Sequence, residues 1–206
     1  MKSSSTPIVM QPVPHGVYQR TAANIADVPI WIDAAEKITR INVRVRLAGR
    51  HKPMRDWQSL ACRRAAGLWR TSIILPAGGW YALDLRMGSG ANASPMTTIA
   101  RVGVGEVFLT AGQSNSANWG ATRQVTTGRC VSAFDGQAWR SARDPMPVCD
   151  GTGGSIWPLL GDILAETLAC PVGFLCVGVG GTSVAEWDPD VPVPVDRPPR
   201  VAAALY

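Results

Sequence analysis

The residues best suited to chemistry lie in the segment 111–116 (AGQSNS), which contains Ser114. They follow residues 106–111 (EVFLTA), a largely apolar run typical of a strand buried on both faces in a parallel sheet. Gly112 permits a tight turn, so the sequence predicts Ser114 at the carboxyl end of this strand. A hydroxyl exposed on such a rigid support is what a serine nucleophile needs.

Spacing alone leaves two interpretations of Ser114 open. In the first, Ser114 attacks an acyl carbon, and a helix that begins after it points unpaired N–H groups at the developing oxyanion. In the second, the segment is an ordinary polar turn, where serine is common. The GQS triplet also differs from the GxSxG elbow of α/β-hydrolases.

The first half of the chain predicts antiparallel sheet. Short stretches of alternating apolar and polar residues, separated by turns, are typical of a β-sandwich. The expected strands are residues 28–33, 41–47, 69–75, 80–86 and 97–104. Together they predict an N-terminal β-sandwich-like domain over residues 1–103, in which the basic stretch 48–68 stays unassigned.

The second half has the pattern of a parallel α/β domain. Apolar residues at helical spacing predict a helix over residues 155–169, with Ser155 as its N-cap and Pro158 in its first turn. Residues 172–179 (VGFLCVGV) predict a second buried strand, whereas residues 116–154 show no periodicity and predict loops. Strand, helix and strand make a βαβ unit, and such units bind ligands at the carboxyl ends of their strands.

Several blocks in this half resemble one protein family. Residues 105–115 (GEVFLTAGQSN) resemble the block that opens the catalytic domain of sialate O-acetylesterases (SASA) and related carbohydrate esterases of the SGNH hydrolase superfamily. Residues 155–166 (SIWPLLGDILAE) resemble the family's helix, and residues 172–189 resemble its block with GGT and a following tryptophan. The resemblance covers about residues 103–190 and implies that residues 104–206 are part of an SGNH-type, flavodoxin-like α/β domain.

The resemblance implies a role for several residues. Ser114 corresponds to the nucleophile, and its own N–H to one oxyanion donor. Gly181 corresponds to the glycine whose N–H is the second donor, and it also suits a turn with positive φ. Gln113, Asn115 and Thr182 correspond to positions that shape the pocket.

A general base is missing from the sequence blocks. The family takes its base and orienting acid from a D-x-x-H block near the carboxyl end and part of its oxyanion pocket from a QGE block, and the sequence contains neither. The two histidines, His15 and His51, precede Ser114 and are expected at the surface or in turns. The chain is therefore expected to be a truncated catalytic domain with negligible esterase activity by itself.

The segment after the glycine loop offers further candidates. Trp187, Glu186 and Asp188 are placed to line a sugar site, with Trp187 as the tentative substrate-binding residue. Glu186 is also a candidate base, although an exposed loop carboxylate is the more common state of such a residue.

Composition limits the other functions. The formal net charge is +5, but Arg44 and Arg46 alternate with apolar residues as on the solvent face of a strand, which disfavours a nucleic-acid partner. The start of the chain lacks the apolar core of a secretory signal, and no segment reaches the length of a membrane span, so a cytoplasmic location is the default expectation.

The five cysteines include no CxxC pair, so neither a metal site nor another cofactor is expected. Cys130 and Cys149 bracket a polar loop and could pair in an oxidising compartment, whereas the odd count favours reduced thiols.

Three functions follow from these observations. The first is a serine-dependent O-acetylesterase that acts on an O-acetylated carbohydrate, with sialic acid or xylan-type sugars as candidates. The second is a non-catalytic carbohydrate-binding or structural module on the same scaffold, which the eight tryptophans and the missing base would suit. The third, ranked last, is a basic nucleic-acid binder, whose affinity would fall steeply with salt. The oligomeric state is not predicted.

Overall fold

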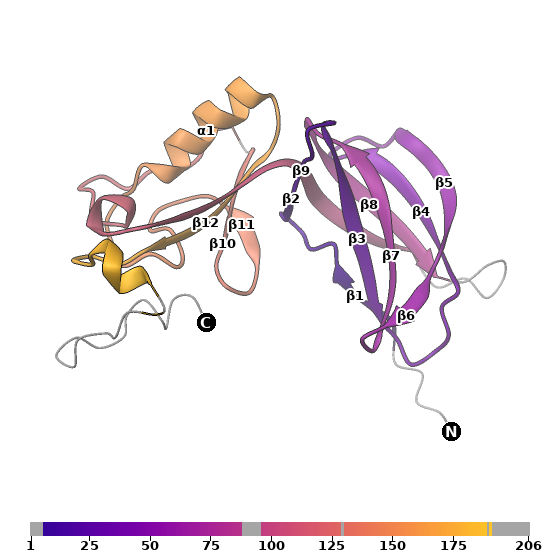
Figure 1. The fold of residues 1–206 in the computed structure, drawn as a ribbon. Coiled ribbons are helices and arrows are strands. Elements are labelled where there is room, and N and C mark those ends of the chain that lie inside the picture. The colour runs from indigo at the N-terminus through magenta and orange to yellow at the C-terminus, as the bar shows by residue number, and fades with distance from the viewer. Residues whose placement is uncertain (1–5, 88–95, 129, 189, 191–206) are drawn as a thin grey trace. The chain divides into compact units, whose positions relative to one another are not determined.

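The computed structural model describes residues 6–87, 96–128, 130–188 and 190. The chain forms two compact units, residues 1–106 and residues 107–206 (Figure 1). The boundary between them lies three residues after the predicted end of the first domain at residue 103. Strands are the main regular structure of the first unit, the second unit combines strands with one α-helix and long loops, and the described part of the chain is therefore mixed α/β.

The first unit consists of two sheets that enclose one hydrophobic core. Its strands are β1 (Ile8–Gln11), β2 (Val17–Gln19), β3 (Ile25–Asp33), β4 (Arg40–Leu47), β5 (Pro53–Ala61), β6 (Arg63–Ala65), β7 (Leu68–Pro76), β8 (Gly79–Met87) and β9 (Thr97–Gly112). One sheet has the order β1-β3-β7-β6, and the other contains β9-β8-β4-β5, with β2 parallel to β9. Neighbouring strands in these two orders are antiparallel, as the alternating sequence predicts.

Alternation along the strands explains the core. In β4, Ile41, Val43 and Val45 are fully buried, and the residues between them are half-buried. Val28 and Ile30 of β3 are also fully buried and belong to the same cluster. One apolar face from each sheet is thus removed from water, and this burial is the main stabilising contribution to the unit.

The arginines of β4 differ from the prediction. The sequence predicts Arg44 and Arg46 on a solvated face, but both guanidinium groups bond to the fully buried carboxylate of Asp84 in β8. Arg46 contacts it through Nε and Nη2, each at 2.8 Å, and Arg44 through Nε at 3.0 Å. Thr98 donates a further hydrogen bond at 2.8 Å. The hydrogen bonds from Arg46, Thr98 and Arg44 outweigh burial and hold the pKa of Asp84 well below its ordinary value.

Strand β9 corrects the predicted break after residue 104. The chain remains extended through Gly103 and Gly105, because both glycines pair with β2. The same strand therefore begins in the first unit and ends in the second at Gly112.

The second unit contains β10 (Val131–Phe134), β11 (Trp139–Ser141), α1 (Trp157–Leu168) and β12 (Val172–Gly178) besides the end of β9. The strand order is β11-β10-β12-β9. β10 is parallel to β12, and α1 makes the crossover between them (Figure 1). The predicted βαβ pattern is therefore present, but its first strand is β10, which lies in a segment predicted to be loop. No helix in the described part of the chain is long and apolar enough to cross a membrane.

The helix start is also shifted from the predicted one. Ile156, and not Ser155, is the N-cap residue, and Pro158 lies in the first turn as expected. The Ser155 hydroxyl donates to the Asp144 carboxylate at 2.6 Å and accepts from the N–H of Trp157 at 3.3 Å. A long-range partner thus ties Ser155 to the preceding loop.

Candidate active site around Ser114

The turn that follows β9 carries Ser114. Residues Ser114–Ser116 form a single 3-10 turn, so the longer helix considered as an oxyanion support does not follow. Gly112 has a φ of +156°, and a side chain at this position would collide with the Ser116 hydroxyl. The turn can therefore close only with glycine at this position.

Both hydrogen-bond donors of Ser114, its N–H and its hydroxyl, bond to the preceding residue. The Ser114 hydroxyl donates to Oε1 of Gln113 at 2.8 Å, and the Ser114 N–H donates to the same oxygen at 3.1 Å. Gln113, which the resemblance places at the pocket, therefore holds both groups that an acyl transfer would use. A substrate carbonyl oxygen must replace Gln113 as the acceptor before the Ser114 N–H can stabilise an oxyanion.

Ser114 lines a cavity of about 480 Å³, within the size range of small-molecule sites. The lining residues are Ser114, Asn115, Ala117, Trp119, Gly120, Ala121, Thr122, Gly154, Ser155 and Ile156. Trp119 and Ile156 are 59% and 56% exposed, so the cavity has an apolar rim. The sequence did not predict these two residues as part of the site. Trp119 lies in the segment 116–154, which shows no periodicity, and Ile156 lies just after it.

The cavity wall is held by close contact between two backbone segments. Gly120 and Gly154 exchange N–H···O=C bonds of 2.8 and 2.7 Å. A side chain at Gly154 would collide with the carbonyl of Thr122. Only glycine lets these two segments approach so closely, and their approach shapes the site.

Buried polar groups fix the loop beneath the cavity. Asn118 is 1% exposed, and its amide donates to the carbonyl oxygens of Met146 and Cys149 at 3.0 and 3.1 Å. Its Oδ1 accepts from the N–H of Met146 at 2.7 Å. The indole N–H of Trp157 donates to the carbonyl of Ser116 at 2.9 Å and ties the start of α1 to the turn that carries Ser114.

The glycine loop after β12 does not contribute to this cavity. Gly181 has a φ of +74°, as a turn glycine should, and is not a lining residue. The Thr182 hydroxyl donates to the carbonyl of Val179 at 2.8 Å and accepts from the indole N–H of Trp187 at 3.1 Å. Thr182 and Trp187 are therefore brought together, but away from the lining of the Ser114 cavity.

The carboxylates considered near the site have structural partners. Glu186 Oε2 accepts from the N–H and hydroxyl of Ser183 at 2.7 and 2.9 Å, which forms a capping box on the 3-10 turn Val184–Trp187. Asp188 accepts from the N–H of Asp190 at 3.0 Å. The geometry therefore assigns Glu186 to holding the turn.

Both histidines belong to the first unit. His51 is exposed, as expected. His15 has a φ of +63°, and its pKa is lowered by burial and by the charge of Arg101. The second unit has no histidine in its sequence, so it supplies no imidazole to Ser114.

The disulfide considered between Cys130 and Cys149 is absent, and none of the five cysteines forms a disulfide. Cys149 is hydrogen-bonded instead to Cys176 of β12. This bond lowers the pKa of Cys149 against the effect of burial, and the bond and burial together raise the pKa of Cys176.

Iodoacetamide is therefore expected to alkylate Cys149 before Cys176, because the thiolate is the reactive form. Peptide mass spectrometry over a pH series measures both rates. Cys176→Ala should move the Cys149 profile to higher pH, since it removes the donor. Cys62 is the slow control, because burial raises its pKa to about 11. Faster modification of Cys176 would contradict the assignment.

The described residues contain no group of three or more His, Cys, Asp or Glu side chains able to hold a metal ion. The groups that this site offers to a ligand are the Ser114 hydroxyl and the exposed indole of Trp119 at the cavity rim. Comparison with protein families finds no family model that matches the chain, and no curated protein matches it either.

Proposed function

We propose that the second unit is the nucleophile-bearing part of a serine-dependent carbohydrate O-acetylesterase. The observation that carries the proposal is the position of Ser114, in a tight turn at the end of β9 and in the lining of a 480 Å³ cavity. The ordered blocks that resemble sialate O-acetylesterases and the SGNH superfamily support the same role.

In the proposed reaction, Ser114 Oγ bonds to the acetyl carbonyl carbon, and the bond from that carbon to the sugar oxygen breaks. The sugar leaves as an alcohol after it gains a proton, and water then hydrolyses the acetyl-serine. The Ser114 N–H bonds the oxyanion once the substrate oxygen displaces Gln113 Oε1. Gly181 as second donor belongs to the same proposal and rests on the resemblance alone.

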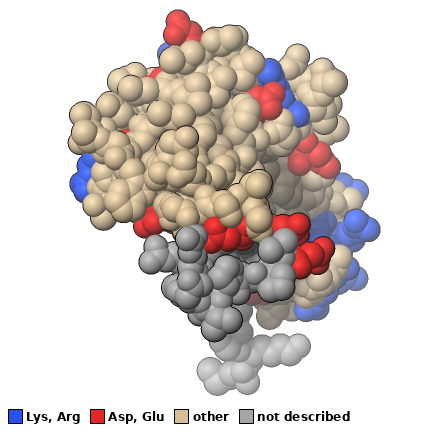
Figure 2. Space-filling view, turned by 60° about the vertical axis from the view of Figure 1, so that its left-hand side comes forward, with Lys and Arg blue, Asp and Glu red and all other residues tan. Residues whose placement is uncertain are grey.

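The surroundings of Ser114 favour a neutral sugar ester as substrate. The exposed indole of Trp119 offers an apolar face to a sugar ring, and the Asn115 side chain offers an amide to its hydroxyls. Figure 2 shows few charged side chains over most of the face that is turned toward the viewer.

The proton of Ser114 needs an acceptor, and the sequence of the second unit contains no histidine to provide one. We therefore expect the 206-residue chain to hydrolyse 4-nitrophenyl acetate no faster than its Ser114→Ala variant. Its rate should lie about 10⁴-fold or more below that of a complete Ser–His–Asp site. Initial rates of the two proteins at equal concentration test this, and a fast, Ser114-dependent rate would mean that a base within the chain reaches Ser114.

A fluorophosphonate probe tests the nucleophile itself. With imidazole added as an external base, we expect the probe on Ser114 in the wild-type chain and no adduct in Ser114→Ala. Ser116→Ala is the matched control, because Ser116 lies in the same turn and should not be the labelled residue. Labelling that is equal in Ser114→Ala, or absent from all three proteins, would reject the proposal.

A second candidate is a non-catalytic carbohydrate-binding module. Two observations favour it: Gln113 occupies both hydrogen-bond donors of Ser114, and Trp119 is exposed at the cavity rim. This function predicts saturable binding of a glycan that Trp119→Ala abolishes, without any labelling of Ser114.

A further inference from the structure

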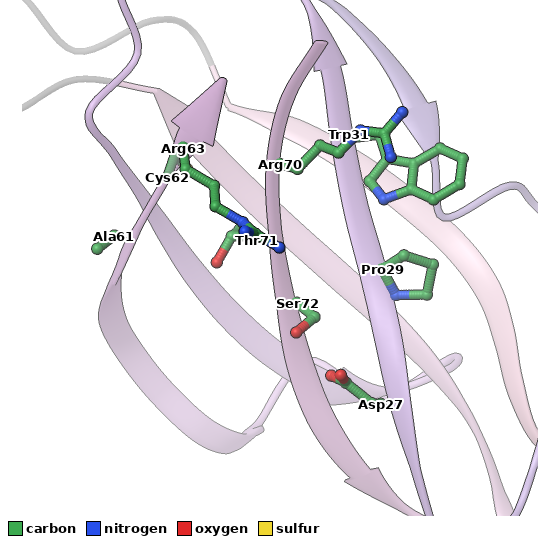
Figure 3. Close-up of a pocket in the computed structure, with 9 residues that line it drawn as sticks. All are labelled: Asp27, Pro29, Trp31, Ala61, Cys62, Arg63, Arg70, Thr71 and Ser72. Carbon is green, nitrogen blue, oxygen red and sulfur yellow. The ribbon is translucent and has the colours of Figure 1, made fainter. Parts of the chain in front are cut away.

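The outer face of the sheet β1-β3-β7-β6 in the first unit carries a second cavity, of about 610 Å³. Figure 3 shows the nine lining residues: Asp27, Pro29, Trp31, Ala61, Cys62, Arg63, Arg70, Thr71 and Ser72. All of them belong to the first unit, so this cavity is independent of the Ser114 site.

Strand register places two arginines and a tryptophan in one row. Arg63 of β6 is the direct partner of Arg70 in β7, and Arg70 is the direct partner of Trp31 in β3. Direct cross-strand partners lie on the same face of a sheet, so the three side chains are neighbours. The Arg70 guanidinium lies over the Trp31 ring, 4.6 Å from its centroid (Figure 3).

The two arginines lack a counter-ion in the described part of the first unit. None of the ion pairs there includes Arg63 or Arg70, and the buried Nε of Arg70 has no hydrogen-bond partner. Burial raises the pKa of the neighbouring Cys62 to about 11, so its thiol stays neutral. Like charges directly opposite each other destabilise a sheet, and a bound anion would relieve this repulsion.

The rest of the cavity suits a ligand with one anionic group and several hydroxyls. Trp31 and Pro29 supply an apolar wall, and Ser72 supplies a hydroxyl. Asp27 lies further along β3 and can accept hydrogen bonds from ligand hydroxyls, but it repels a second anionic group placed beside it.

The net charges of the two units also favour an anionic ligand for the first unit. Residues 1–106 contain 14 of the 20 Lys and Arg residues and six of the 15 acidic ones, a formal charge of +8. Residues 107–206 contain six basic and nine acidic residues, a formal charge of −3. An anionic ligand is therefore attracted to the first unit.

We infer that this cavity binds an acidic sugar, with its carboxylate on Arg63 and Arg70 and its ring beside Trp31. Guanidinium groups bind carboxylates through paired N–H···O bonds, and two of them on neighbouring strands favour a charged group over a neutral one. The ligand class is thus a uronic-acid-type oligosaccharide.

Calorimetric titration of the whole chain with a neutral oligosaccharide that carries a single glucuronic acid tests the inference, with the uncharged methyl ester of the same oligosaccharide as the second ligand. We expect the acid to bind and the ester to bind at least about tenfold more weakly. Arg63→Gln and Arg70→Gln should each weaken binding of the acid by about tenfold or more.

Arg50→Gln is the matched control, because Arg50 lies outside the cavity and its loss removes the same charge from the unit. Ser114→Ala should also bind the acid like the wild type. Thermal unfolding should show that the Arg63 and Arg70 variants are folded. Equal affinity for acid and ester, no binding of either, or equal weakening by Arg50→Gln would overturn the inference. A DNA oligonucleotide that binds more tightly than the acid would overturn it as well, in favour of general attraction of polyanions.

Discussion

Replacing Asp84 by alanine should lower the free energy of unfolding of the first unit by about 3–5 kcal/mol. The carboxylate is fully buried and holds Arg44, Arg46 and Thr98. Its removal leaves two guanidinium groups facing each other without a counter-charge. Hydrogen exchange of β4 and β8 peptides in increasing urea reports this unit separately from the second one.

Two variants serve as controls for Asp84→Ala. Glu36→Ala removes an exposed carboxylate from the same unit and should change the free energy of unfolding by no more than about 0.5 kcal/mol. Thr98→Val removes a single hydrogen bond to Asp84 and should cost about 1 kcal/mol. If Asp84→Ala were no more destabilising than Thr98→Val, the charge cluster would not stabilise the unit.

The same carboxylate makes the stability of the first unit depend on pH. Its pKa in the folded state lies below the value of about 3.9 expected in the unfolded chain. The contribution of Asp84 is therefore complete above about pH 4 and is lost as the pH falls below that, toward the folded pKa. In the wild type, the urea concentration at the midpoint of hydrogen exchange in the β4 and β8 peptides should fall as the pH is lowered from 7 to 3. The part of this fall that is due to Asp84 should be missing in Asp84→Asn.

Phe174→Ala should cost the second unit about 3–5 kcal/mol of unfolding free energy. Phe174 of β12 is 1% exposed, and its ring lies 5.8 Å from that of Phe108 and 5.6 Å from that of Trp157. Trp157 in turn bonds the Ser116 carbonyl, so the loss of Phe174 should also loosen the turn that carries Ser114.

Hydrogen exchange of β10 and β12 peptides and fluorophosphonate labelling with added imidazole measure the two effects of Phe174→Ala. Phe134→Ala is the control, because Phe134 is only half-buried and its ring contacts Trp139, whose strand β11 ends the sheet. We expect a smaller loss of stability and normal labelling in this variant. Equal stability losses in the two variants would show that the cluster around Phe174 is not the main core of the unit.

Local pattern was sufficient to predict five strands of the first unit, β3, β4, β7, β8 and the first part of β9, but not the strands β1, β2, β5 and β6. Alternation identified β4 and β8 within a residue at each end. It did not identify β5, because that strand is exposed along most of its length and shows no apolar period. The sequence predicted separate strands over residues 97–104 and 106–111, but pairing with β2 keeps β9 extended through Gly105.

The candidate site was only partly predictable, because its walls depend on contacts distant in sequence. The turn that carries Ser114 could be predicted from its own residues, since Gly112 and Ser114 are close together in the chain. The cavity wall forms because the backbone of Gly120 pairs with that of Gly154. The role of the Ser155 hydroxyl depends on its hydrogen bond to Asp144. Such pairs leave no periodic signal, which also explains why the four-residue strand β10 was missed.

The arginines of β6 have a consequence for how copies of this chain meet. β6 is the last strand of its sheet, and β5 is the last strand of the facing one. Free strand edges are where polypeptides add to one another and begin to aggregate. In β5, the charge of Arg55 is balanced by that of its neighbour Asp56. Arg63 and Arg64 give the β6 edge a positive charge, so two copies repel each other where their β6 edges would otherwise join.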